Sequence, residues 1–201
     1  MLQVGLTGGL ASGKSFVGRA LAELGCHLID ADELGHQVLL PGAEAYDAVV
    51  NEFGEEILDE DRYIVRRKLG ALVWDHPERL AKLNSIVHPA VIAREEGIIA
   101  KIAQTDPAAI VVVESAILVE TGSYRRFDRL IVVVCTVEQQ VERAMRRGAY
   151  SKEEVLARLS RQLPLEDKVR VADYVIDTSG TKEHTLEQVK SVYESLRSLS
   201  A

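Results

Sequence analysis

The segment GLTGGLASGKS, residues 5–15, decides which fold the sequence predicts. It matches the pattern Gly-x-x-x-x-Gly-Lys-Ser/Thr, with Gly8 and Gly13 as its two glycines. Glycines let a backbone turn successive N–H groups inward around an anion, while the lysine contacts phosphate and the serine contacts Mg²⁺. Because the segment follows an apolar run and precedes a helical pattern, it predicts a phosphate-binding loop. An ordinary strand-to-helix turn is the alternative.

Composition and charge narrow the class of protein. A chain of 201 residues that is 47% hydrophobic is long enough for one good core and an appended lobe. The net charge of −7 argues against a general nucleic-acid binder, which relies on surplus lysine and arginine. The sequence has no signal segment and no apolar run near twenty residues, so we expect a cytoplasmic protein without a membrane partner. Cys26 and Cys135 show no metal-ligand spacing and predict two reduced, buried thiols.

Short apolar runs alternate with helical patterns along most of the chain. They are too short for typical helices and rich in valine and isoleucine, as strands buried on both faces are. Such alternation predicts a parallel sheet with helices on both sides. A first helix follows Lys14 and ends before Gly25. The five predicted strands are Gln3–Leu6, His27–Ile29, Ile110–Val113, Leu130–Cys135 and Tyr174–Ile176.

One long interval interrupts this alternation, because residues 33–105 contain no convincing strand. Pro77 and Pro89 each stand where a helix could begin at its first position, and a long helix is predicted after Pro89. Seventy helical residues exceed what a crossover between two strands needs. The interval therefore predicts a helical lobe that forms one wall of a cleft.

Two aspartates follow the second predicted strand, in the segment LIDAD. In an extended chain, Asp30 and Asp32 would point to the same face, at the carboxyl end of a parallel strand where ligands bind. A carboxylate there can accept a hydroxyl proton or help to hold a metal ion. Alternatively, one of the two caps a helix that starts near Glu33.

Two further helices are predicted after Cys135. The first carries Arg143 and Arg147 one turn apart, and the second begins at a capping box formed by Ser151 and Glu154. Arginines on such a pair of helices suit a lid that closes over phosphates and stabilises the charge of a transferring phosphoryl group. A solvated helical hairpin is the alternative.

Taken together, these segments resemble the dephospho-coenzyme A kinase family. The resemblance is carried by GLTGGLASGKS, LIDAD, the pair His88–Pro89, the segment Arg143–Gln162 and ADYVIDTSG at residues 172–180. It spans nearly the whole chain. It implies an α/β P-loop NTPase fold, a three-layer α/β/α arrangement with a five-stranded parallel sheet. Residues 1–32 and 106–201 would form the nucleotide-binding core, 33–105 an inserted helical CoA-binding lobe, and 138–165 a lid.

The resemblance also implies a reaction and a site. ATP, with Mg²⁺, would phosphorylate the ribose 3′-hydroxyl of dephospho-CoA, the last step of CoA synthesis. Asp32 would act as the base, with Lys14, Arg143 and Arg147 as the other catalytic residues, and Ser15 would bind the metal. Asp30 and His88 would lie on the acceptor side, although a histidine before a proline can simply satisfy backbone groups. The predicted nucleotide contacts are Gly8, Gly9, Ala11, Ser12, Gly13, Lys14, Ser15 and Phe16.

Three positions depart from the family's pattern. Phe16 stands where threonine is frequent, and Gly148 where aspartate is frequent. After the third strand, the segment Glu114–Leu118 replaces Asp-Val-Pro-Leu-Leu, so Glu114 is either part of the metal's surroundings or a buried, hydrogen-bonded carboxylate.

Two other functions compete with this prediction. A nucleoside or nucleotide kinase of the same fold would share the loop and the lid. A GTP-binding switch is disfavoured, because Thr181–His184 lacks the aspartate of the guanine-recognition motif Asn/Thr-Lys-x-Asp.

Overall fold

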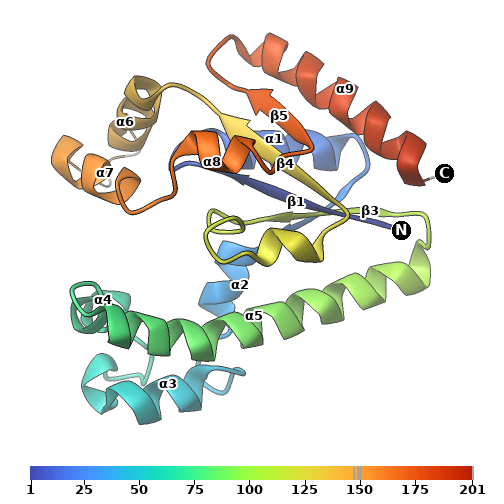
Figure 1. The fold of residues 1–201 in the computed structure, drawn as a ribbon. Helices are drawn as coiled ribbons and strands as arrows, with labels where there is room; N and C mark the ends of the chain where they lie inside the picture. The colour runs from blue at the N-terminus through green and yellow to red at the C-terminus, as the bar shows by residue number, and fades with distance from the viewer. Residues whose placement is uncertain (147, 149–150, 201) are drawn as a thin grey trace. The chain divides into compact units, whose positions relative to one another are not determined.

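A five-stranded, fully parallel sheet in the order β2-β3-β1-β4-β5 organises the computed structural model, which describes residues 1–146, 148 and 151–200 (Figure 1). The central strand, β1, aligns Leu6 with Glu114 on one side and with Ile131 on the other. All five predicted strands are confirmed, with ends that shift by one or two residues. The strands are β1 (Leu2–Gly8), β2 (His27–Asp30), β3 (Ile110–Glu114), β4 (Arg129–Val134) and β5 (Tyr174–Asp177).

The chain divides into two compact units. The sheet unit comprises Met1–Asp30 and Ile102–Ala201, and the helical unit comprises Ala31–Lys101. The sequence analysis set the corresponding lobe at 33–105. In the structure, the last turn of helix α5 (Pro77–Thr105), from Ile102 onward, belongs to the sheet unit.

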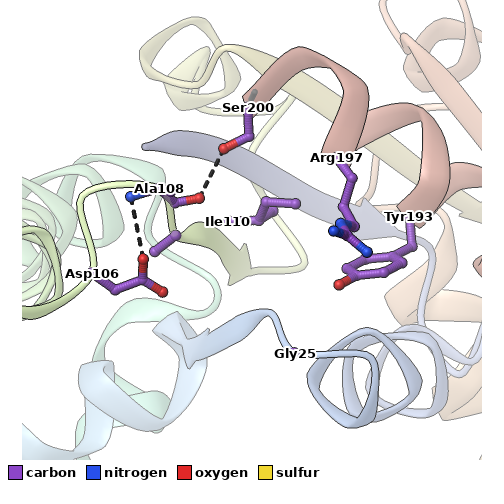
Figure 2. A pocket seen from close by; sticks show the side chains of 8 residues that line it. Gly25, Asp106, Ala108, Ile110, Tyr193, Arg197 and Ser200 are labelled. Atoms are coloured by element: carbon purple, nitrogen blue, oxygen red, sulfur yellow. Dashed lines mark hydrogen bonds between the residues drawn. The ribbon is translucent and has the colours of Figure 1, made fainter.

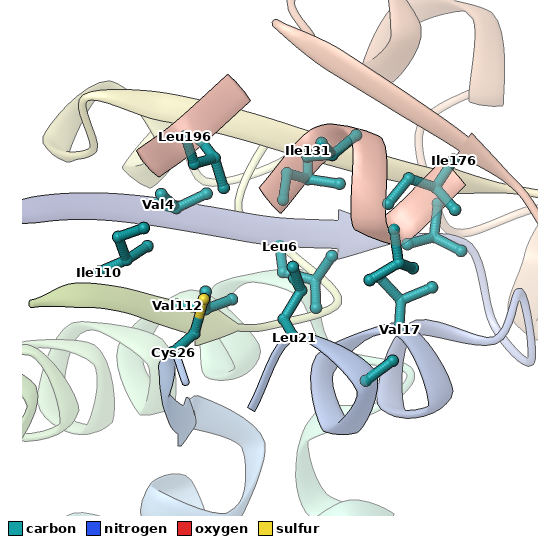
Figure 3. Packing of buried hydrophobic residues seen from close by; sticks show 14 of the residues in the cluster. Val4, Leu6, Val17, Leu21, Cys26, Ile110, Val112, Ile131, Ile176 and Leu196 are labelled. Atoms are coloured by element: carbon teal, nitrogen blue, oxygen red, sulfur yellow. The ribbon is translucent and has the colours of Figure 1, made fainter. Parts of the chain in front are cut away.

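One face of the sheet is covered by α1 (Lys14–Glu23) and α9 (Lys182–Ser200), whose apolar sides meet the strands (Figure 3). Val17 and Leu21 of α1 and Leu196 of α9 are fully buried there. On the other face, Leu118, Leu130 and Val132 pack against side chains from the 3-10 helix η2 (Ser123–Arg126) and from α8 (Leu165–Val169). The sheet is therefore the middle layer of three, as the sequence predicts.

Helix α1 begins and ends at the predicted positions. Gly13 precedes it with φ of 99°, and Gly25 follows it with φ of 107°; both values lie in the left-handed region that favours glycine. The N–H of Gly25 bonds to the carbonyl of Ala22, and the N–H of Cys26 to that of Leu21, which closes the last turn.

The helical unit has a core of its own. Its elements are α2 (Ala31–Gln37), α3 (Tyr46–Phe53), the 3-10 helix η1 (Glu55–Ile57), α4 (Arg66–Val73) and most of α5. Val49, Phe53 and Ile57 are buried at its centre, and leucines of α5 pack against them. Arg94 of α5 forms a bidentate pair with Glu44, at 3.0 and 2.6 Å. Residues 31–105 contain no strand, only an isolated bridge between Leu58 and Ile64.

The prediction that a helix begins at Pro89 is wrong, whereas Pro77 does begin one. Helix α5 runs continuously from Pro77 to Thr105 with Pro89 inside it. An internal proline removes one hydrogen bond and costs about 3 kcal/mol. In the part of α5 that precedes Pro89, Leu83 and Val87 pack against the core of the helical unit, and in the part that follows, Ile99 is buried. Burial of apolar side chains in both parts of the helix outweighs the cost of the proline.

The two helices predicted to form a lid are present as α6 (Val137–Arg146) and α7 (Lys152–Leu159). The predicted capping box is confirmed: the N–H of Ser151 bonds to Oε2 of Glu154 at 2.7 Å, and the N–H of Glu154 bonds to Oγ of Ser151. Val141, Ala144 and Val155 form a small apolar cluster with Ala11 of the loop.

The two cysteines are free and buried, as predicted, and burial raises the pKa of the Cys26 thiol to about 11. Among the described residues, no helix combines the length and the apolar content needed to cross a membrane.

Candidate phosphoryl-transfer site

The predicted phosphate-binding loop connects the end of β1 to the start of α1 at the carboxyl edge of the sheet. The Nζ of Lys14 bonds to the carbonyls of Gly8 and Gly9, at 3.2 and 3.1 Å, so its ammonium group lies over the loop. A side chain at Gly8 would collide with the carbonyl oxygen of Val133 in β4, so the loop can leave the sheet only through a glycine. A helix N-terminus behind a glycine-rich turn attracts anions through its N–H groups and its dipole.

Glu114 lies at the end of β3, beside the loop. The residue is 5% exposed, and its Oε1 accepts a hydrogen bond of 2.8 Å from Oγ of Ser15. Of the two roles left open by the sequence, the structure shows the hydrogen-bonded one, and the partner is the serine predicted to bind Mg²⁺. A hydroxyl beside a carboxylate is a pair of oxygen ligands of the kind Mg²⁺ prefers.

Arg143 of α6 contacts the residue that follows β5. Its Nη1 bonds to Oγ1 of Thr178 at 3.0 Å and its Nη2 to the carbonyl of Thr178 at 2.7 Å. The Thr178 hydroxyl donates in turn to the carbonyl of Ser12, at 2.6 Å. The arginine thus reaches the loop through Thr178, a residue that the sequence prediction missed. Its position at the carboxyl end of a predicted strand was the available signal. Arg147 lies outside the described residues.

The two aspartates do not lie together in extended chain, so that part of the prediction is wrong. Asp30 is the last residue of β2, and Asp32 stands in the first turn of α2, which begins at Ala31. The segment from Ala31 to Leu34 contains good helix formers, and acidic side chains in a first turn interact favourably with the helix dipole. The alternative prediction was a helix that starts near Glu33. The helix is present, but it starts two residues earlier, at Ala31.

Asp32 and His88 belong to the helical unit, and the loop, Glu114 and Arg143 belong to the sheet unit. His88 lies in the middle of α5 and is half-buried. Burial lowers its pKa below the ordinary value of 6.5, because a charged imidazole loses hydration there. His88 is therefore neutral at pH 7.

A hollow of about 510 Å³ lies at the opposite, amino-terminal edge of the strands. Figure 2 shows Tyr193 and Arg197 of α9 on one side of it and Asp106 on the other. It includes none of the predicted site residues. Within the described ranges, no cluster of three or more histidine, cysteine, aspartate or glutamate side chains could hold a metal ion.

A parallel sheet whose central strand leads through Gly-x-x-x-x-Gly-Lys-Ser into a helix, with arginines on the two helices that follow β4, defines a P-loop kinase. The sequence model of the dephospho-CoA kinase family matches residues 2–184. The chain belongs to the dephospho-CoA kinase family, phosphotransferases that use ATP to phosphorylate dephospho-CoA in coenzyme A biosynthesis. The nucleoside kinase and GTP-switch interpretations are not favoured.

Individual relatives agree with this assignment. A dephospho-CoA kinase of Aquifex aeolicus is 42% identical over 196 residues, which cover 98% of each chain. A crystal structure from Thermus thermophilus superimposes with a TM-score of 0.82 at 32% identity over 97% of each chain. A dephospho-CoA kinase from Campylobacter jejuni shares the fold, with a TM-score of 0.73 at 24% identity over 99% of this chain and 98% of its own.

Proposed function

We propose that this chain transfers the γ-phosphoryl group of ATP to the ribose 3′-hydroxyl of dephospho-CoA, with Mg²⁺ bound to the nucleotide, and releases ADP and CoA. The observation that carries the proposal is the loop Gly8–Ser15 at the start of α1, in a chain that the dephospho-CoA kinase family model matches over residues 2–184. Dephospho-CoA is a small-molecule partner, and the negative net charge of the chain gives no support for nucleic acid.

On the donor side, the loop from Gly8 to Phe16 holds the phosphates of ATP. Lys14 neutralises the charge that spreads over the transferring group, and Ser15 would hold Mg²⁺ through its hydroxyl, where the ion would supply positive charge beside the phosphates. Glu114 orients that hydroxyl through the 2.8 Å hydrogen bond and adds negative charge near the cation. This arrangement makes Glu114 a partner of the metal-binding serine.

On the acceptor side, Asp32 takes the proton of the attacking hydroxyl. Its position supports this role, because it lies two residues beyond the end of β2. Two peptide units span at most about 7 Å, so the chain itself keeps Asp32 close to the carboxyl edge of the sheet. Asp30, in the sheet unit, and His88, in the helical unit, would contact the acceptor. The helical unit would bind the CoA moiety.

The lid contributes positive charge and excludes water. Arg143 and Arg147 stand one helical turn apart in the sequence, and Arg143 already reaches the loop through Thr178. We assign Arg143 to holding the loop and the nucleotide, and Arg147 to the transferring phosphoryl group. Closure of the segment 138–165 over the nucleotide would limit wasteful hydrolysis.

The test is ADP formation from MgATP with and without dephospho-CoA, with the product identified by mass. We expect ADP formation that depends on dephospho-CoA, together with CoA heavier than the acceptor by one phosphate group. Lys14→Met should slow turnover by orders of magnitude, and Asp32→Asn should abolish transfer while ATP still binds. Folded, ATP-binding protein that forms no acceptor-dependent ADP would refute the proposed reaction, and an active Asp32→Asn variant would refute the base.

A further inference from the structure

The residue Leu10, near the tip of the phosphate loop, is held by two glutamines of the lid. Nε2 of Gln140 donates to the Leu10 carbonyl at 2.8 Å, and the Leu10 N–H donates to Oε1 of Gln162 at 2.9 Å. Gln140 lies in α6, and Gln162 follows α7. Gln140, near the start of α6, and Gln162, after the end of α7, therefore each make one hydrogen bond to the backbone of Leu10.

The contact from Gln140 is close and buried. Gln140 as a whole residue is 6% exposed, and a Cβ placed on Gly9 would overlap Nε2 of its side chain. A buried amide needs its hydrogen bond, because leaving the group unpaired costs its full desolvation free energy. Gly9 thus leaves the space through which the lid amide reaches the loop.

Apolar side chains reinforce the same junction. Leu10 and Ala11 pack with Val141 and Ala144 of α6 and with Val155 of α7. Ala11 has φ of 55°, a left-handed conformation that costs free energy for a residue with a Cβ and persists only where its surroundings impose it. The Leu10 carbonyl belongs to the peptide plane that leads into Ala11, so Gln140 orients the plane beside this conformation.

We infer that Gln140 and Gln162 are positioning residues for the phosphate loop. Together they orient two successive peptide planes, Gly9–Leu10 and Leu10–Ala11, so that the loop tip and the base of the lid, where α6 begins and α7 ends, form one mechanical unit. The inference rests on the proposed function, because it concerns how the loop is shaped for the phosphates of ATP. Loss of either bond loosens the loop and weakens nucleotide binding, but leaves binding of dephospho-CoA unchanged.

The experiment compares Gln140→Met, Gln162→Met and the double variant, because methionine keeps the length of the side chain and lacks its amide. We expect each single variant to raise the KM for ATP and the Kd for MgATP about fivefold, the effect of one net hydrogen bond. The KM for dephospho-CoA should stay within twofold, with Tm near that of the wild type.

Hydrogen exchange of the Leu10 amide, followed by NMR, tests the contact without any turnover. Gln162→Met should speed this exchange at least tenfold, whereas Gln162→Glu should preserve protection, since a carboxylate oxygen can accept the same bond. Gln139→Met is the matched control, because Gln139 lies beside Gln140 on α6 but donates to the carbonyl of Ser179; it should leave the Leu10 exchange unchanged.

A folded double variant with an unchanged Kd for MgATP would overturn the inference. An equal rise in the KM values of ATP and dephospho-CoA, together with a lower Tm, would also overturn the inference, because that pattern indicates general destabilisation. Failure of the proposed function is distinguishable, because wild-type protein would then form no ADP that depends on dephospho-CoA. The Leu10 exchange and the MgATP titration would still decide the role of the two glutamines.

Discussion

Lys168 and Glu120 form a buried ion pair whose disruption should destabilise the protein strongly. Lys168 of α8 is 1% exposed and Glu120 is 17% exposed, with Nζ and Oε1 separated by 2.5 Å. Nζ also donates to the carbonyl of Ala116, at 3.3 Å. The pair connects α8, which follows α7, to the segment after β3.

The expected loss of stability follows from two opposing contributions to the free energy of unfolding, the Coulomb attraction within the pair and the desolvation of its two ions. At 2.5 Å and an effective dielectric constant of about 20, the Coulomb attraction is about 7 kcal/mol, and desolvation of the two ions offsets most of it. Removing the cation alone leaves that desolvation cost without the attraction. Lys168→Met should therefore lower the free energy of unfolding by about 3–5 kcal/mol, out of a total of about 5–15 kcal/mol.

Urea denaturation, followed by circular dichroism, measures the loss. The double variant Lys168→Met/Glu120→Leu should recover at least about 2 kcal/mol, because it removes the unpaired carboxylate. Arg170→Met is the control: its pair with Asp167 has side chains 74% and 42% exposed, so the loss should stay below about 1 kcal/mol. The reasoning fails if Lys168→Met costs less than about 1 kcal/mol, or if the double variant is no more stable than the single one.

Three further outcomes follow from burial and charge. Leu21→Ala should lower the free energy of unfolding by about 2–5 kcal/mol in urea, because Leu21 is fully buried, and a comparable loss in the exposed control Leu186→Ala would contradict this explanation. The lowered pKa of His88 means that, as the pH falls below 6.5, the unfolded chain binds a proton before the folded chain does, so stability should fall until the pH passes the folded pKa. His88→Gln should flatten that decline between pH 7 and 5, and a decline as steep as that of the wild type would contradict this cause. Glu114→Gln should raise the Mg²⁺ concentration needed for half-maximal activity about 10- to 100-fold, and an unchanged Mg²⁺ titration would remove Glu114 from the metal's surroundings.

The sequence by itself determined the elements whose signals are local. The loop from Gly8 to Ser15, the five strands and the capping box at Ser151 each consist of neighbouring residues whose types favour one backbone conformation. Family resemblance then brought the aspartates and the lid arginines into one hypothesis. Local signals were misleading where packing or helix propensity competed with them, as at Pro89, which α5 passes through.

Only the tertiary structure decided which side chains meet. Ser15 and Glu114 are 99 residues apart in sequence, and Thr178 is 166 residues from the Ser12 carbonyl that it contacts. Gln140 and Gln162 contact Leu10 across 130 and 152 residues of sequence. No periodicity in the sequence predicts such contacts, because they depend on strand order and on the register that aligns the carboxyl ends of β3, β1, β4 and β5. A parallel sheet places strand ends that are distant in sequence at one edge, and the side chains at that edge then contact one another.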